Sequence, residues 1–308
     1  MRSAVVIGAV NMDIGAVSRV PLVERDSNPG HVGTSLGGVG RNIAHNLRLL
    51  GVDTAMVTVL GDDGFAAAVR SGAKEIGLDL RYSAVIPGAR TSSYVYLAGP
   101  DGDMVLAVND MDIYRQMTPA FLAERLDFIN SAGFAVLDAN LPAESIAWLC
   151  EHITVPIIAD PVSTVKADRL RGVLGKLTAL KPNRMEAEAL SGVPIRSAAD
   201  AEKAAEALLA TGLKQVYISL SSDGIFAAER GGERVHYPCP RVEIVNATGG
   251  GDAMVAALTA SLLRGEGLAR AARNAICAGA FASMAQTTIH PGMSWENIEK
   301  IRESEEWI

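Results

Sequence analysis

The chain has 308 residues, is 49% hydrophobic and carries a formal net charge of −7 at pH 7, with no run of Lys and Arg, which argues against nucleic acid as the main partner. Its three cysteines, Cys150, Cys239 and Cys277, are widely spaced and form no C-x-x-C pair, so neither a disulfide framework nor a zinc site is expected. No apolar stretch has the length of a signal peptide or a membrane span, which predicts a soluble, cytoplasmic protein without a membrane partner.

Short β-rich segments bounded by Gly, Asp or Pro recur along the chain and predict buried strands. They cover residues 4–7, 54–60, 135–137, 157–159 and 216–220. Helical patterns lie between them, as where Val39, Ile43, Leu47 and Leu50 precede Gly51. This alternation predicts an α/β fold, with one doubly wound, mostly parallel sheet flanked by helices, in a single domain over residues 1–308.

Two segments, at about residues 12–35 and 90–112, interrupt the alternation. In the second, Ser93, Val95 and Leu97 alternate before an Asp101-Gly102 turn, and an apolar run follows it, which predicts a β-hairpin. Insertions of this kind commonly sit above the carboxyl ends of the strands, where such sheets bind ligands, so we expect a small β lid. A flap that serves only dimerisation is the alternative.

The segment from Asn246 to Asp252, with sequence NATGGGD, carries the strongest chemical signal. Gly249, Gly250 and Gly251 open an apolar helix, and amides without side chains at a helix N-terminus can hold phosphoryl oxygens. Asp252 in the first turn would then face the anion and accept a proton from an attacking hydroxyl. The plainer interpretation is that Asp252 only caps the helix. Neither a G-x-x-x-x-G-K-[ST] loop nor a well-placed G-x-G-x-x-G is present.

Three motifs together resemble the ribokinase-like PfkB family of carbohydrate kinases over most of the chain. They are GGVGRN at residues 37–42, KPNRME at residues 181–186 and NATGGGD at residues 246–252. The resemblance implies a ribokinase-like fold, ATP and Mg²⁺ as cofactors, Asp252 as catalytic base and an anion hole from the amides of Gly249, Gly250 and Gly251. It also implies that Asn183 and Glu186 organise magnesium, with Glu186 acting through water. Helix capping is the alternative for both residues.

Further positions follow from the same resemblance. On the ATP side it assigns Ser219, Gly224 and Thr248, although Ser221 stands where the family has glycine. Asn246 replaces the aspartate that anchors a monovalent cation in some relatives, which leaves cation activation open. On the acceptor side the resemblance assigns Asn11, Asp13, Gly38 and Asn42, with Asp13 accepting hydrogen bonds from two sugar hydroxyls. The alternative is that Asp13 stabilises a turn and Asn42 lies solvated on a helix face.

Within the family, the segments at residues 26–30, 91–94, 109–111 and 160–166 resemble pseudouridine kinases more than ribokinases. That resemblance implies phosphorylation of the 5′-hydroxyl of pseudouridine, with Ser93 and Lys166 at the uracil ring and Lys166 donating to a carbonyl. A solvated lysine at a helix start is the alternative for Lys166.

Three other functions remain open. The chain could phosphorylate another nucleoside or a free sugar such as ribose, it could be a silent nucleoside-binding protein on the same fold, or, more remotely, an oxidoreductase. The missing dinucleotide fingerprint argues against the last. The family's exposed lids often meet in homodimers, so a homodimer is expected.

Overall fold

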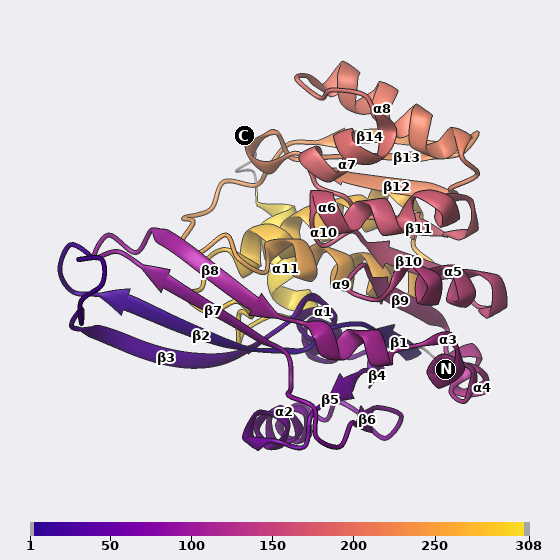
Figure 1. Ribbon diagram of the computed structural model, residues 1–308. Coiled ribbons are helices and arrows are strands. Elements are labelled where there is room, and N and C mark those ends of the chain that lie inside the picture. The colour runs from indigo at the N-terminus through magenta and orange to yellow at the C-terminus, as the bar shows by residue number, and fades with distance from the viewer. Residues whose placement is uncertain (1–2, 305–308) are drawn as a thin grey trace.

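The computed structural model describes residues 3–304 and contains a central eight-stranded sheet in the order β14-β13-β12-β11-β10-β9-β1-β4 (Figure 1). The first six strands in chain order are β1 (Ser3–Ile7), β4 (Asp53–Val57), β9 (Phe134–Asp138), β10 (Ile157–Asp160), β11 (Ala179–Leu180) and β12 (Gln215–Ser219). They pair in parallel, whereas β13 (Ile225–Glu229) and β14 (Arg234–Tyr237) add an antiparallel edge. The predicted mostly parallel, doubly wound sheet is confirmed.

Helices cover both faces of this sheet because its central strands are buried on both sides. One face packs against α1 (Val39–Leu49), α9 (Gly250–Leu263), α10 (Leu268–Ala282) and α11 (Trp295–Glu303). The other carries α3 (Pro119–Ala123), α4 (Leu126–Asn130), α5 (Ala143–His152), α6 (Thr164–Ala167), α7 (Arg184–Ser191) and α8 (Ala198–Ala210), with the 3₁₀ segments η1 (Asp112–Gln116) and η2 (Asp168–Lys176). The short η3 (Ser221–Asp223) follows β12. No helix within residues 3–304 is long and apolar enough to cross a membrane.

A second, four-stranded sheet projects from one end of the central sheet (Figure 1). Its order is β3-β2-β7-β8, from β2 (Asn11–Ser18), β3 (Gly30–Gly37), β7 (Ser93–Ala98) and β8 (Met104–Asp110). The predicted hairpin is present, because β7 and β8 pair antiparallel around Gly102, whose φ is 85°. Both segments that interrupt the α/β alternation therefore meet in one small sheet.

The two faces of the small sheet differ in character, because side chains alternate along each strand. Ser35, Asp13, Tyr94 and Asn109 form one row across the four strands and share the inner face. The outer face exposes large apolar side chains, with Val32 and Val108 both 65% exposed. The inner face thus presents a row of polar side chains, and the outer face is mainly apolar.

One predicted strand divides in two. The sequence indicates continuous β structure over residues 54–60, but β4 ends at Val57 and β5 (Val59–Leu60) pairs with β6 (Ala84–Val85) in a separate parallel pair. β4 is the edge strand of the central sheet, and the next residue, Thr58, donates its amide to the Ser83 hydroxyl outside that sheet. The chain then passes to α2 (Gly64–Glu75).

Candidate active site

The glycine-rich segment ends in an open helix N-terminus. Gly249 is the N-cap of α9 with φ 86°, and no side chain caps this helix. A side chain at Gly249 would overlap the Thr288 carbonyl oxygen, whereas one at Gly250 would find its nearest atoms 3.4 Å away. The turn therefore needs glycine at position 249, and its first amides are free of side-chain caps, as an anion site requires.

Asp252 occupies the first turn of α9 and is 9% exposed. Its Oδ2 accepts a hydrogen bond of 2.8 Å from Asn42 Nδ2 on α1. Burial, then the nearby charge of Asp160, raise the pKa of Asp252 to about 8, against the opposing effects of Asn42 and Lys181. A carboxylate with a pKa near the working pH is suited to general base catalysis. The solvated alternative for Asn42 is wrong, because its side chain is buried against Asp252.

A buried charge pair lies beside this helix start, and its role was not assigned from the sequence. Lys181 Nζ lies 3.9 Å from Asp160 Oδ2, and both side chains are almost fully buried. A Cβ added to Gly251 would lie 3.2 Å from the same ammonium. Lys181 therefore places a positive charge next to the glycine amides, where it would favour bound phosphoryl oxygens. The KPNRME motif contains this lysine, so the signal was present in the sequence.

Asn183 and Glu186 form a reciprocal capping box at the start of α7. Asn183 Oδ1 accepts from the Glu186 amide at 2.9 Å, and Glu186 Oε2 accepts from the Asn183 amide at 2.8 Å. The capping alternative is thus realised for both residues. Burial, then the charge of Asp160, raise the pKa of Glu186.

The carboxyl groups of Asp160 and Glu186 fit a magnesium ion that takes its other ligands from phosphates and water. Asp160 and Glu186 bring two buried carboxyl groups together, and a cation there would relieve their repulsion. Within the described residues, no group of three or more His, Cys, Asp or Glu side chains is placed to hold a metal ion unaided. Such an ion would therefore depend on ligands that arrive with the nucleotide.

Two positions in the segment after β12 have a backbone conformation that favours glycine. Gly224 has φ 89°, and a side chain there would overlap the Tyr237 carbonyl oxygen of β14. Ser221 has φ 57°, a left-handed conformation that costs a non-glycine residue free energy. Ser219 sits at the end of β12, where its amide donates to the Pro182 carbonyl at 2.9 Å and so joins the segment to α7.

Asn246 spans the loop before the glycine turn. Its Oδ1 accepts from the Thr248 amide at 2.9 Å, and its Nδ2 donates to the Gln286 carbonyl at 3.0 Å. Both ends of the amide are therefore used within the protein, and the Gln286 oxygen faces an N–H donor. The residue 246 side chain therefore orders the loop before the glycine turn.

The acceptor side of the site opens from the inner face of the small sheet. A cleft of about 970 Å³ is lined by Asp13, Arg41, Tyr94 and Thr248, among others. Burial raises the pKa of Asp13 to about 6, although the positive charge of Arg41 opposes this shift. The Asp13 carboxylate is therefore still mainly ionised at pH 7, as hydrogen bonding to two sugar hydroxyls requires.

Gly38 and Asn11 join the elements that carry the acceptor residues. Gly38 has φ 94°, and a side chain there would lie 2.6 Å from the Ala9 carbonyl oxygen, so only glycine lets α1 start against β1. Asn11 Oδ1 accepts from the Ser92 hydroxyl at 2.8 Å, which joins β2 to the residue before β7.

The strand register places Ser93 and Asp13 on different faces of the small sheet. Ser93 pairs with Met12, whereas Tyr94 pairs with Asp13, so Ser93 lies on the opposite face of the small sheet from Asp13. Tyr94 therefore lines the cleft of Asp13, whereas Asp110, the residue opposite Ser93 on β8, lines the cavity that also contains Lys166. Sequence alternation alone could not decide which residues face inward.

Lys166 lies in a second cavity of about 390 Å³, with Asn109, Met111, Asn140 and Arg169 among its lining residues. Its Nζ donates to Asn140 Oδ1 at 2.5 Å. Desolvation, the main effect, lowers the pKa of Lys166. Lys166 thus lies at a helix start, as the solvated alternative has it, but it is partly buried and its ammonium is held by Asn140.

Asp138 is a buried residue whose carboxyl group connects several elements, and the sequence motifs did not reveal it. Its Oδ2 accepts from the Ala9 and Gly40 amides at 2.7 and 2.8 Å, and its Oδ1 accepts from the Asn140 amide at 2.9 Å. One carboxyl group thus joins the end of β1, the first turn of α1 and the residue that contacts Lys166. The only sequence signal was an acidic residue at the end of a predicted strand.

This fold and site define a nucleotide-dependent phosphotransferase. A buried carboxyl group and an open glycine turn lie beside a cleft that leads to a polar acceptor site. In support, the model of the pfkB family carbohydrate kinases matches residues 1–294.

Related proteins and solved structures match this chain over nearly its full length. The chain is 34% identical to a pseudouridine kinase of Escherichia coli, over 99% of this chain and 97% of the relative. A putative sugar kinase of Clostridium perfringens superposes with a TM-score of 0.88 at 32% identity, over 98% of this chain and 96% of that one. The ribokinase of Arabidopsis thaliana complexed with ribose and ATP gives 0.87 at 22% identity, covering 99% of each chain, and so shows the shared fold. The chain belongs to the pfkB family and is an ATP-dependent kinase with a ribokinase-like fold.

Proposed function

We propose that this kinase transfers the γ-phosphoryl group of ATP to the 5′-hydroxyl of pseudouridine. The observation that carries the proposal is the continuity of the inner face of the small sheet. Asp13, Tyr94 and Asn109 lie in one row, and Asn109 also lines the cavity of Lys166. Three strands spaced by about 4.8 Å span roughly 10 Å, which suits a sugar at Asp13 and a base at the second cavity. A free pentose would leave that cavity empty.

The proposed base site carries polar groups suited to a uracil ring. Lys166 presents a partly desolvated ammonium donor, and the Asn140 amide that holds it can present N–H donors to the same space. Uracil carbonyls accept such bonds. The 34% identity to a pseudouridine kinase supports the same acceptor.

In the proposed reaction, Asp252 accepts the proton of the 5′-hydroxyl while that oxygen bonds to the γ-phosphorus. The bond between the γ-phosphorus and the bridging β–γ oxygen breaks, and ADP leaves with the electron pair. The amides after Gly249 and the ammonium of Lys181 stabilise the charge on the transferring group. Magnesium bound to the nucleotide phosphates would lie toward Glu186 and Asp160, with Asn183 ordering the turn.

We also propose that the small sheet acts as a lid and that its outer face forms a homodimer contact. Val32, Val95, Leu106 and Val108 share this face, and each is at least 43% exposed. Exposed apolar patches on a sheet favour association. A cytoplasmic location is proposed because ATP is available there and the three cysteines are free thiols.

The test is coupled ADP release with purified protein, ATP and Mg²⁺. Pseudouridine is compared with uridine, cytidine, adenosine, ribose and fructose. A preference for pseudouridine supports the proposal. A preference for another nucleoside or for ribose keeps the kinase and rejects the base assignment, and no turnover with any acceptor supports a silent binding protein.

A further inference from the structure

Arg41 is a partly buried arginine for which neither the family motifs nor the reaction above provide a role. It lies in the first turn of α1, and desolvation lowers its pKa although Asp13 opposes that shift. Its Nη1 donates to the Leu36 carbonyl of β3 at 2.9 Å and to Asn42 Oδ1 at 3.2 Å. One guanidinium thus contacts the small sheet and a residue that touches the proposed base.

The bonds of Asn42 show what this contact does. An amide side chain has one accepting end and one donating end. The accepting Oδ1 faces the guanidinium of Arg41, and the donating Nδ2 faces the carboxyl group of Asp252 at 2.8 Å. Rotating the amide by 180° would turn its NH₂ group toward a cation and its oxygen toward a carboxylate. Arg41 therefore makes one orientation of Asn42 strongly preferred.

We propose that Arg41 is a positioning residue that acts through Asn42 on Asp252 and links the base to the acceptor site. The inference rests on the proposed role of Asp252. Arg41 fixes the amide so that it donates to the carboxylate form of Asp252. The same guanidinium provides the positive charge near Asp13 and bonds to β3, so both ends of the acceptor site share one cation.

The other charges around Asp252 do not depend on Arg41. Asp160 and Asp138 raise its pKa and Lys181 lowers it, from the ends of β10, β9 and β11. Asn42 is the one group from α1 that lowers it. Loss of the orienting arginine is thus expected to raise the pKa of Asp252, because the hydrogen bond that favours the ionised form is weakened.

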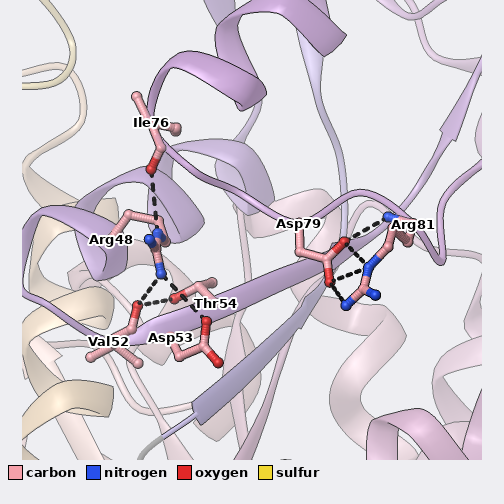
Figure 2. A network of polar contacts seen from close by, with 7 residues as sticks. All are labelled: Arg48, Val52, Asp53, Thr54, Ile76, Asp79 and Arg81. Carbon is pink, nitrogen blue, oxygen red and sulfur yellow. Dashed lines mark hydrogen bonds and ion pairs between the residues drawn. The ribbon is translucent and has the colours of Figure 1, made fainter.

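The experiment compares Arg41→Met with a matched control on the same helix. Arg48 also bonds backbone carbonyls, of Ile76 and Val52, together with Asp53, but touches no site residue (Figure 2). We expect Arg41→Met to lower kcat by about 10-fold to 10²-fold and to move the acid limb of its pH profile upward by roughly one unit. Arg48→Met should leave both unchanged. The acceptor is the one that the unmodified enzyme phosphorylates best.

Two further variants separate positioning from charge alone. Arg41→Lys keeps a cation near Asp13 but is shorter, so KM should recover more than kcat. Asn42→Leu removes the relay, and adding Arg41→Met to it should have little further effect on kcat. A rise in KM with unchanged kcat and pH profile, or full additivity of the two substitutions in kcat, would overturn the inference.

A measurement without turnover distinguishes this inference from the proposed function. Carboxyl carbon NMR of selectively labelled protein follows the titration of Asp252 directly, with Asp252→Asn to assign the signal. Arg41→Met should raise the pKa of Asp252 and Arg48→Met should not. An unchanged pKa in Arg41→Met rejects the relay even where the enzyme is active, and a raised pKa supports it even where every tested acceptor fails.

Discussion

The phosphoryl end and the acceptor end of the site are built by different means. At the phosphoryl end, Gly249 and Asp252 begin a helix that packs between α1 and α10. Gly249, which has no Cβ, lies directly against the backbone of Thr288. At the acceptor end, Asp13 and Tyr94 stand on a small sheet whose outer face is open to solvent. A buried backbone turn tolerates little change, whereas residues on a small sheet can vary with the acceptor. We therefore expect chemistry to be determined at one end and specificity at the other.

The largest effect is expected at the phosphoryl end. Asp252→Asn removes the proton acceptor but keeps the shape, so turnover should fall by about 10²-fold to 10⁴-fold while acceptor binding persists. Steady-state kinetics and calorimetric titration with the acceptor measure the two quantities. Near-normal turnover would reject the base.

Two adjacent glycines allow a second test at the phosphoryl end, in which Gly250→Ala is the control for Gly249→Ala. Gly249→Ala should lower kcat by more than about 10²-fold and destabilise the fold, because of its positive φ and the overlap with Thr288. Gly250→Ala has no such overlap, so its activity and melting temperature should stay close to those of the unmodified enzyme. A similar loss of activity and melting temperature in both variants would mean that the backbone conformation of the turn is not what requires glycine at position 249.

At the acceptor end, Lys166→Met should change discrimination more than chemistry. Losing one charged hydrogen bond donor to the base should raise KM for the nucleoside by about 10-fold to 10²-fold and leave kcat within a few-fold. Ribose, which lacks the base, serves as the control acceptor. An equal loss with ribose would remove Lys166 from the base site.

The two ends should also differ in pH dependence. The pKa values of Asp13 and Asp252 are raised to about 6 and about 8, and both groups act as carboxylates. At saturating ATP, kcat/KM for the acceptor should therefore rise with pH. A plot of log(kcat/KM) against pH should have a slope of two below pH 6, a slope of one between pH 6 and 8, and a plateau above pH 8. In Asp13→Asn, the lower break should disappear and the break near pH 8 should remain.

The smallest effect is expected on stability, at Ser221 in the segment after β12. Ser221 adopts a φ of 57°, so Ser221→Gly should relieve strain and stabilise the protein by about 1 kcal/mol. Denaturant unfolding detects a difference of this size. A loss of stability would show that the serine side chain compensates for its conformation.

The sequence by itself determined the alternating α/β pattern, the glycine turn with Asp252, and the polar residues Asn11 and Asp13 after the first strand. Each depends on local chemistry: periodic burial, glycine conformations and a helix N-terminus can be recognised within a few residues. Even so, residues 54–60 appeared as one strand, because the end of an edge strand is set by its partners.

Only the tertiary structure decided which residues meet. Asn42 reaches Asp252 across 210 positions of sequence, and Lys166 reaches Asn140, because different strands end at the same edge of the sheet. The register of β7 against β2 turned Tyr94 inward and Ser93 outward, a choice that depends on pairing with β2 and not on the segment itself. The orientation of the Asn42 amide likewise depends on Arg41, because hydrogen bond direction is fixed only when both partners are in place.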